Sequence, residues 1–349
     1  MAVFCPLCSF IGANMSKVTL KDVAREAKLG LATVERVING RGGVTEKTIE
    51  KVIRAAKKLE YGTRQSHFNR GAIRIEVILV RPETSFFARL NQAFERIAAS
   101  LDKNVILHRT FVKESDPVGM ARHVANPAFR RSGLIICAPD DARVSASLRK
   151  ASAAGVEVVQ IVARCDPDIP FVGIDDYAAG RCAAYYMTGM LGARAGKLVA
   201  LCHSGAYANH RLRIKGFSDY IEEHGRTEHS FSLVMFGHDD DLQSAELLSE
   251  AHRRNPDIIG VYSAGGGDEG VAIVLQQWAK HKDVYWVGHE LTDKKKRHLQ
   301  SGLMDICIDQ TPEVQARRAV DMILHKLDII HTEIITDPVR FTTINAQNV

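Results

Sequence analysis

From Ile73 onward the sequence alternates short apolar, β-branched runs with segments of helical period, and this alternation limits the fold more than any other feature. The first run, IRIEVILV, is followed by GLIICAP and VEVVQIV. Strands and helices that alternate in this way form parallel βαβ layers. The pattern pauses at Asp175-Asp176, which we expect to cap a long helix, and restarts with a strand at Lys197. Two successive layers predict a two-lobed α/β core over residues 74–349. We expect lobe 1 to comprise about 74–174 and 311–328, and lobe 2 about 175–308 and 335–349.

Before this core, two short helical periods are separated by a tight break. Apolar residues of LKDVAREA recur at spacings of three and four, which marks one face of a helix, and Thr19 precedes them as the expected N-cap. The break is Lys28-Leu29-Gly30, and LATVERVIN follows as the second period. Two helices joined in this way form the helix-turn-helix arrangement, whose second helix enters the major groove of DNA. Any helical hairpin would share this pattern, so the helix-turn-helix interpretation needs further evidence.

A third amphipathic segment and a local excess of positive charge give that support. The segment runs from about Thr45 to Leu59. Its apolar residues, which we expect to close a three-helix core, are Ile49, Val52, Ile53 and Ala56. Residues 16–64 hold twelve Lys/Arg and six Asp/Glu, so the whole excess behind the net charge of +5 lies in this head. Such a head suits phosphate binding, although a solvated basic face would look the same.

The sequence of the head also resembles that of a known family. It opens with TLKDVAREA, continues with TV-x-RV-x-NG and ends with VTEKT-x-x-x-V-x-x-AAKKL-x-Y, so residues 18–61 are similar to the head of the lactose-repressor (LacI/GalR) family. The resemblance implies a helix-turn-helix domain over 16–64 and a hinge over 65–73. It also implies a homodimer whose two heads bind the halves of a near-palindromic operator DNA. Residues 1–15 precede the usual start of such heads, and we expect them to be a disordered extension.

The resemblance assigns the DNA-contacting residues as well. They are Thr19, Leu31, Ala32, Thr33, Arg36 and Asn39. An arginine can donate two hydrogen bonds to guanine, whereas Leu31 and Ala32 can only make apolar contacts, for example to a thymine methyl. The family's two usual serines are Gly30 and Glu35 here, so we expect weaker or differently registered binding. In the hinge, Phe68 is the expected substitute for the leucine that separates two bases.

The core resembles the type I periplasmic sugar-binding proteins, most clearly in GIDDYAAGRCAAYYM and VGHEL. This resemblance implies that a small effector, a sugar or a sugar acid, binds between the lobes and changes the placement of the heads. The expected effector-binding residues are Phe86, Phe87, Asp140, Arg164, Arg213, Asp268, Glu290 and Gln310.

These residues match the relatives by their motifs. The two phenylalanines follow the first strand, where rings stack on apolar sugar faces, although either could belong to the core. Arg213, in RIKGF, matches an arginine that bonds sugar hydroxyls or carboxylates, and a surface arginine is the alternative. Glu290 stands where relatives have the aspartate of VGFD, and Gln310 matches the polar residue at the lobe crossing. Asp268 belongs to the loop that lines the cleft in relatives.

Two further assignments rest on strand ends. Asp140 follows a strand, where open α/β sheets bind ligands, but helix capping explains it equally well. Relatives often carry an Asp-Arg pair where this chain has Ala163-Arg164. The lost acid beside a retained base favours an anionic effector such as a sugar acid, since an arginine binds a carboxylate well.

A glycine motif raises a different function. The motif, G-x-G-x-x-G, lies between an expected strand and an expected helix and consists of Gly265, Gly267 and Gly270. Such a motif is typical of dinucleotide-binding domains. The resemblance places this loop at the effector cleft, where close approach of the backbone explains the glycines. G-x-S-x-G, Walker A and H-E-x-x-H motifs do not occur. We therefore predict a regulator, not an enzyme, without a cofactor. A sugar receptor of a transporter and a nucleotide-cofactor enzyme are the alternatives.

The cysteines and the apolar segments of the sequence indicate the cellular compartment of the protein. Seven cysteines, an odd number mostly in apolar contexts, suit free thiols in a reducing cytoplasm. Cys5 and Cys8 have metal-like spacing without a second pair, so we expect no metal site. The first fourteen residues do not read as a signal peptide, and no apolar run approaches the roughly 18 residues of a membrane span. We expect a cytoplasmic protein without membrane contact.

Overall fold

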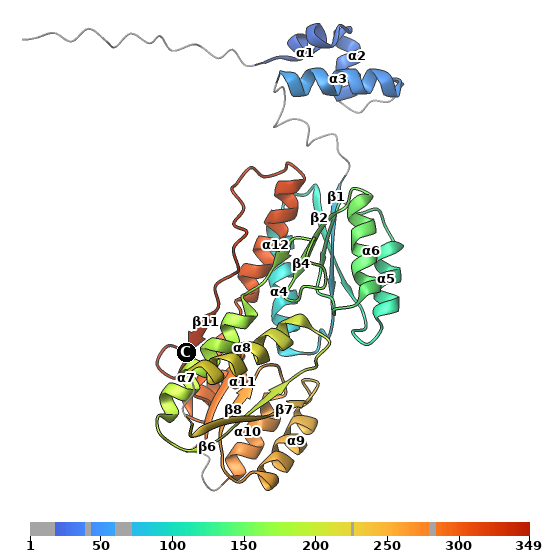
Figure 1. Cartoon of the computed structure of the whole chain (residues 1–349). Helices are drawn as coiled ribbons and strands as arrows, with labels where there is room; N and C mark the ends of the chain where they lie inside the picture. The colour runs from blue at the N-terminus through green and yellow to red at the C-terminus, as the bar shows by residue number, and fades with distance from the viewer. Residues whose placement is uncertain (1–17, 39–42, 60–71, 225–226, 279–283) are drawn as a thin grey trace, which may run out of the picture. The chain divides into compact units, whose positions relative to one another are not determined.

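The computed structural model describes residues 18–38, 43–59, 72–224, 227–278 and 284–349, and the chain divides into two units between Ala72 and Ile73. The expected N-terminal extension, the hinge with Phe68, and Asn39 lie outside the described residues. The first unit is a head of three helices (Figure 1). Their bounds are Leu20–Ala27 for α1, Leu31–Ile38 for α2 and Glu46–Lys58 for α3.

Local interactions explain where α1 begins and ends. Asp22 Oδ2 accepts hydrogen bonds from the backbone N–H of Thr19 over 2.8 Å and from its hydroxyl over 2.7 Å, which closes the first turn. Lys28 has a φ of 54°, in the left-handed region where helices commonly end. The tight break between α1 and α2 therefore follows the sequence as predicted.

The residues that α3 contributes to the core of the head differ in part from the prediction, although Ala56 does pack against it as expected. Val23, Val34 and Val52 are completely buried, with Ala55 beside them. The prediction that Ile49 and Ile53 belong to this core is wrong, because their exposed fractions are 37% and 47%. The buried stripe of α3 passes through Val52 and Ala55, and the two isoleucines lie four residues apart on a neighbouring face of the helix.

Lobe 1 of the second unit is a parallel sheet in the order β2-β1-β3-β4-β5. Ile73 of β1 pairs with Val105 of β2, and Ile75 with Gly133 of β3. The central strands are buried on both faces, which is why they read as continuous apolar runs. Helices α5 and α6 cover one face, and α4 and α12 cover the other (Figure 1). The bounds are β1 Ile73–Leu79, α4 Ser85–Ser100, β2 Val105–Phe111, α5 Pro117–Ala125, β3 Gly133–Ile136, α6 Ala142–Ala153, β4 Glu157–Ile161, β5 Phe171–Val172 and α12 Pro312–Lys326.

Lobe 2 is a sheet in the order β11-β10-β9-β8-β6-β7, in which only β11 runs antiparallel among the described strands. Helices α7 and α8 pack together on one side, and α9, α10 and α11 lie on the other. The strand β11 was not predicted. The bounds are α7 Asp176–Leu191, β6 Gly196–Cys202, α8 Ala208–His224, β7 His229–Phe236, α9 Asp241–Arg254, β8 Ile258–Ser263, α10 Asp268–Gln277, β9 Tyr285–His289, α11 Asp293–Gln300, β10 Ile306–Asp309 and β11 Thr342–Ile344.

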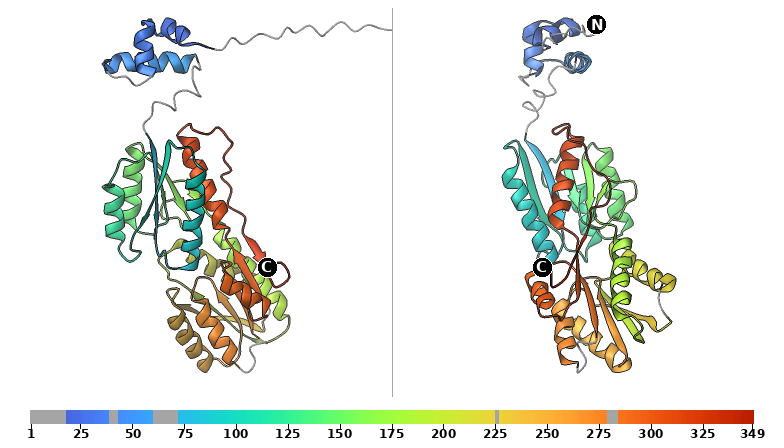
Figure 2. Two further views of the ribbon diagram at one scale, coloured as in Figure 1. Left: turned by 180° about the vertical axis from the view of Figure 1, so that it is seen from behind. Right: turned by 90° about the vertical axis from the view of Figure 1, so that its left-hand side faces the viewer.

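The chain passes between the lobes after β5, after β10 and after α12. Helix α12 thus lies beside α4 in lobe 1, although it follows β10 of lobe 2 in the sequence (Figure 2). This arrangement confirms the predicted two-lobed α/β core with parallel sheets. Among the helices that the structure describes, none is long and apolar enough to cross a membrane.

Candidate functional site

The outer side of α2 is the candidate DNA-contacting surface. Ala32 and Arg36 are exposed there, and Val34 on the opposite side is completely buried. Leu31 and Thr33 are half-buried, so less of each side chain is available to a partner. The helix therefore presents a polar and small-residue face around Arg36, as a helix that enters a groove requires.

Thr19 has a structural task in addition to the predicted contact with DNA. Its hydroxyl donates to Asp22 and its backbone N–H does the same. These bonds lower the pKa of the Asp22 carboxyl. The residue is exposed, so a phosphate could reach it, but its hydroxyl already serves the first turn of α1.

In the second unit, a pocket of about 330 Å³ lies between the loops that follow the strands of both lobes. Six of the eight expected effector-binding residues line it. They are Phe86, Phe87, Arg213, Asp268, Glu290 and Gln310. The carboxyl ends of parallel strands from two sheets meet here, which is where open α/β sheets place ligands.

The pocket does not include Asp140 and Arg164. Asp140 is exposed and forms an ion pair with Arg211 over 2.5 Å. Arg164 is exposed too, and its guanidinium donates to the carbonyl oxygens of Asp166 and Pro167. Local backbone acceptors hold this arginine, so the argument for an anionic effector loses the residue on which it rested.

Arg213 enters the pocket from α8 as one half of a buried ion pair. Its Nε donates to Asp176 Oδ1 over 2.8 Å and its Nη1 donates to the carbonyl of Ala264 over 2.9 Å. Helices α7 and α8 approach closely at this point, and the glycine at position 180 allows the approach. A Cβ on Gly180 would lie 2.0 Å from the Arg213 carbonyl oxygen. The third nitrogen, Nη2, is buried and has no hydrogen-bond partner among the described residues.

Glu290 and Gln310 both line the pocket and contact each other there. The Gln310 amide donates to Glu290 Oε1, which leaves Glu290 Oε2 and Gln310 Oε1 buried and without partners in the described part of the chain. Burial raises the pKa of Glu290 to about 8, and the nearby Asp309 carboxylate adds to the effect. Glu290 has a φ of 66°, so its backbone is in the left-handed region. Such outliers are often found at functional sites.

Asp268 and Lys295 form a second buried pair in lobe 2. Lys295 Nζ lies 2.7 Å from Asp268 Oδ2 and also donates to the carbonyl of His289. Burial raises the pKa of Asp268 despite the lysine beside it. Asp268 Oδ1 remains without a partner among the described residues, so it can accept a hydrogen bond from a ligand.

A charged cluster at the pocket was not predicted. Arg81 lies against Asp239 and Glu114, with Nε 2.9 Å from Glu114 Oε2, and its guanidinium lies 5.2 Å from the centre of the Phe87 ring. His203 Nε2 lies 2.9 Å from Glu114 Oε1. Burial opposes ionisation of Asp239, but the Arg81 guanidinium holds the pKa of Asp239 below its usual value. Arg81 and Asp239 come shortly after β1 and β7, so the strand-end rule could have identified them.

The glycine loop is not free to bind a phosphate. Gly266 N–H donates to Asp239 Oδ1 over 2.6 Å, and Glu269 N–H donates to Asp241 Oδ1 over 3.2 Å. Carboxylates of the chain thus already occupy amides that a pyrophosphate would need. A Cβ on Gly270 would lie 1.8 Å from the Asp241 carbonyl oxygen, so helix packing accounts for that glycine. The dinucleotide interpretation has no support here.

The fold and the pocket define a class: a two-lobed α/β binding domain with a buried polar pocket, attached to a helix-turn-helix head. Residues 75–328 match the family described as "Periplasmic binding protein domain", and residues 19–63 match "Bacterial regulatory proteins, lacI family". The chain belongs to the periplasmic binding protein domain family and carries the head of the lacI family of regulators.

Relatives of known name include regulators. The pepR1 regulator of Lactobacillus delbrueckii subsp. lactis is 33% identical over 97 residues, 27% of this chain and 29% of its own length. The ribose operon repressor of Halalkalibacterium halodurans is 33% identical over 95 residues, 26% and 29% of the two chains. DegA of Bacillus subtilis is 26% identical over 215 residues, 60% and 62%. The chain thus spans under a third of the first two relatives and less than two thirds of the third.

Solved structures with a similar fold include solute-binding proteins. The glucose-galactose binding protein GanP of Geobacillus stearothermophilus superposes with a TM-score of 0.71 at 18% identity, covering 80% of this chain and 99% of GanP. A periplasmic solute-binding protein of Actinobacillus succinogenes 130z with bound D-allose gives 0.69 at 17% identity, covering 79% and 98%. At these identities the likeness establishes the fold of the second unit.

Proposed function

We propose that this protein is a DNA-binding transcriptional regulator whose affinity for its operator is controlled by an uncharged sugar bound between the lobes. The observation that carries the proposal is the mixture of unpaired polar atoms in the pocket. Arg213 Nη2 can only donate, whereas Asn209 Oδ1 and Gln310 Oε1 can only accept. A ligand that satisfies both kinds at close range needs several groups that donate and accept, and sugar hydroxyls do so.

The walls of the pocket fit the same ligand. Phe86 is half-buried and supplies a ring face for the C–H groups of a sugar, whereas Phe87 is 4% exposed, belongs to the hydrophobic core and already lies under the Arg81 guanidinium. A pocket lined by a few convergent polar groups and aromatic rings is typical of a small-molecule site. The named relatives include a ribose operon repressor, and one structural neighbour holds D-allose, which agrees with a monosaccharide.

Charge favours a neutral sugar over a sugar acid. Each Arg and Lys that lines the described pocket already lies against a carboxylate: Arg81 against Asp239, Arg213 against Asp176, Lys294 against Glu269 and Lys295 against Asp268. Burial lowers the pKa of His210 to about 3, so this histidine, which also lines the pocket, is neutral and adds no positive charge. A ligand carboxylate would therefore enter a pocket without a free cation, at an unfavourable desolvation cost.

The head supports the regulatory half of the proposal. It carries the lacI-family match, an exposed Arg36 on α2 and the positive excess of the chain. We propose that it binds one half of an operator, that a homodimer supplies the other half, and that the protein works in the cytoplasm without a cofactor or catalytic activity. A sugar receptor of a transporter is the second candidate, because the solved neighbours of the core are solute-binding proteins.

A thermal-shift screen of the full chain tests the ligand class. The panel contains D-ribose, D-allose, D-arabinose, D-glucose and D-galactose, each beside its aldonic acid. A sugar at a hundred times its dissociation constant should add roughly 2.7 kcal/mol of stability, and its acid should add much less. An acid that outperforms its parent sugar would contradict the charge argument, and no stabilisation by any sugar would contradict the ligand class.

A further inference from the structure

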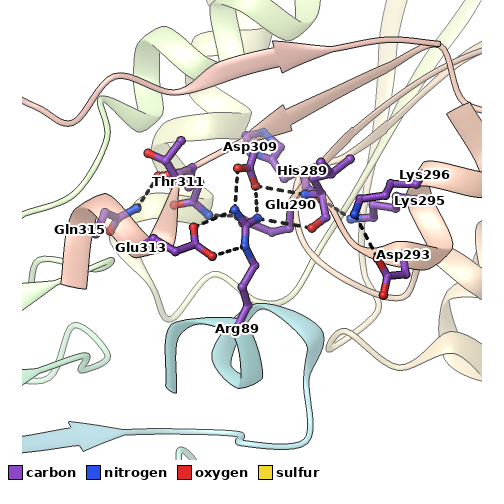
Figure 3. A network of polar contacts seen from close by, with 12 residues as sticks. Arg89, His289, Glu290, Asp293, Lys295, Lys296, Asp309, Thr311, Glu313 and Gln315 are labelled. Carbon is purple, nitrogen blue, oxygen red and sulfur yellow. Dashed lines mark hydrogen bonds and ion pairs between the residues drawn. The ribbon is translucent and has the colours of Figure 1, made fainter. Parts of the chain in front are cut away.

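Arg89 uses all of its N–H donors at the edge of the pocket, although it does not line the pocket (Figure 3). Nε and Nη2 donate to the two oxygens of Glu313 over 2.7 and 2.8 Å. Nη1 and Nη2 donate to the two oxygens of Asp309 over 2.6 and 3.1 Å. Nη1 also donates to the carbonyl of Leu291 over 3.3 Å. An arginine has five such donors, and each has an acceptor here.

The acceptors belong to both lobes. Arg89 is on α4 and Glu313 is in the first turn of α12, both in lobe 1, whereas Asp309 ends β10 in lobe 2. Asp309 Oδ1 also accepts a hydrogen bond from the Leu291 N–H over 3.1 Å. Both backbone groups of Leu291 are therefore held, the carbonyl by Arg89 directly and the N–H through Asp309.

Leu291 directly follows Glu290, and this adjacency gives the cluster a consequence for the ligand. The left-handed φ of 66° at Glu290 is uncommon for a residue with a Cβ and persists only when the surroundings fix it. Glu290 N–H donates to the Ile308 carbonyl over 2.9 Å, and the held Leu291 fixes the other side. The direction of the Glu290 carboxyl thus depends on the residue that Arg89 restrains.

Gln310 is restrained from lobe 1 in a similar way. Gln315 of α12 is completely buried, and its amide donates to the Gln310 carbonyl over 2.9 Å. The Gln310 amide in turn donates to Glu290. Two pocket side chains of the β9 and β10 ends are therefore fixed by residues of α4 and α12.

We propose that Arg89 is a positioning residue for the effector: through Asp309 and Leu291 it fixes the loop that directs Glu290 into the pocket, and it does so only while lobe 1 contacts lobe 2. Ligand binding at Glu290 and closure of the lobes then stabilise each other, because each requires the same loop conformation. This inference rests on the proposed function for its ligand, but the restraint on the loop can be measured without any ligand.

Hydrogen exchange of the full chain, followed by mass spectrometry, tests the restraint. In Arg89→Met, peptides that cover Leu291 should exchange about tenfold faster or more, while peptides of β1 and β8 in the sheet cores keep their wild-type rates. Asp309→Asn should give the same local effect, and the double variant should add little to either. Equal rates in wild type and Arg89→Met would overturn the proposal, as would a uniform increase over all core peptides.

Arg96→Met is the matched control. Arg96 is on the same helix and reaches Glu313 over 3.7 Å, but it has no ion pair with Asp309 in the described structure and its side chain is 64% exposed. Its removal should leave exchange at Leu291 unchanged. An effect at Leu291 as large as that of Arg89→Met would show that loss of any charge on α4 suffices, and would overturn the assignment to Arg89.

Titration calorimetry with D-allose and D-arabinose supplies the ligand readout. For a sugar that binds the wild type, Arg89→Met should raise the dissociation constant about tenfold, mainly through faster release, and Arg96→Met should leave it within about twofold. Unchanged affinity in Arg89→Met would overturn the positioning role. If neither these two sugars nor any other sugar of the thermal-shift panel binds the wild type, the ligand class is contradicted, and hydrogen exchange alone decides whether Arg89 restrains the loop.

Discussion

Arg213 Nε donates to Asp176 Oδ1 over 2.8 Å, and the two side chains are only 2% and 4% exposed. The arginine that the resemblance assigned to the ligand is therefore also half of an ion pair that joins α7 to α8. Removal of one partner from a buried pair leaves an uncompensated charge, which is strongly destabilising.

Arg213→Met should accordingly lower the free energy of unfolding by about 3–5 kcal/mol in urea titrations of the full chain. Asp176→Asn combined with Arg213→Met should cost less than the sum of the two single changes, because neither charge is then left alone. Wild-type stability in Arg213→Met would contradict the pair. Loss of sugar response in this variant is thus a poor test of ligand contact.

Glu290 predicts a pH dependence of stability with a definite sign. Its pKa is raised by burial from 4.5 to about 8, so the folded state binds this proton more tightly than the unfolded state. The contribution of this proton to the free energy of unfolding should be fully present below about pH 4.5 and should be lost as the pH rises through 8. Glu290→Gln, which keeps the oxygen that accepts from Gln310, should be more stable than wild type by up to about 5 kcal/mol at pH 9 and similar to it at pH 4.

Glu269→Gln is the control of opposite sign. Burial opposes ionisation of Glu269, but His298 and Lys294 hold the pKa of Glu269 below its usual value, so its contribution is present at high pH and lost as the pH falls. The variant should be less stable than wild type at pH 8 and similar to it in acid. Thermal unfolding of the variants across this range measures both effects. The same pH profile for Glu290→Gln and wild type would refute the assignment.

Most of the fold could be predicted, because the residues that set each element are adjacent to it. Asp240 and Thr292 precede α9 and α11 and accept hydrogen bonds from Gln243 N–H and Lys295 N–H, as caps do. Strand β11 could not be predicted, since three residues without a buried pattern pair antiparallel with a distant strand.

The pocket could be predicted in part. The resemblance and the strand-end rule placed Arg213, Glu290 and Gln310 at one site, and the structure brings them together. The ion-pair partners of the charged side chains could not be predicted from local sequence patterns, because partners such as Arg89 and Asp309 are 220 residues apart in the sequence. Arg164 was misplaced because its motif position says nothing about the backbone carbonyls two and three residues ahead.

In the head, Arg36 is exposed on the outer side of α2 and should contact the operator. Arg36→Ala should weaken binding by about 1–3 kcal/mol if the arginine makes two hydrogen bonds to one guanine, and should relax the preference for that base. Gel-shift titrations on DNA selected from genomic fragments measure both. Arg54→Ala, an exposed arginine on α3, serves as the control. Equal losses in the two variants, without a change in base preference, would point to phosphate contact alone.

The full chain should be a dimer at micromolar concentration. One head buries a small surface on DNA, and regulators of this kind gain affinity from paired half-sites. Sedimentation velocity gives the mass directly. A monomer that retains full affinity for a two-half-site DNA would contradict the expected pairing of heads.

The central claim is that a sugar in the pocket changes the affinity of the head for DNA. The most direct measurement is a fluorescence anisotropy titration of the full chain with its selected DNA, with and without a saturating neutral sugar identified by thermal shift. We predict a change of about 5-fold or more in the dissociation constant for DNA, in either direction, and a much smaller change in Glu290→Gln. Tight binding of the sugar with no change in DNA affinity would contradict the account.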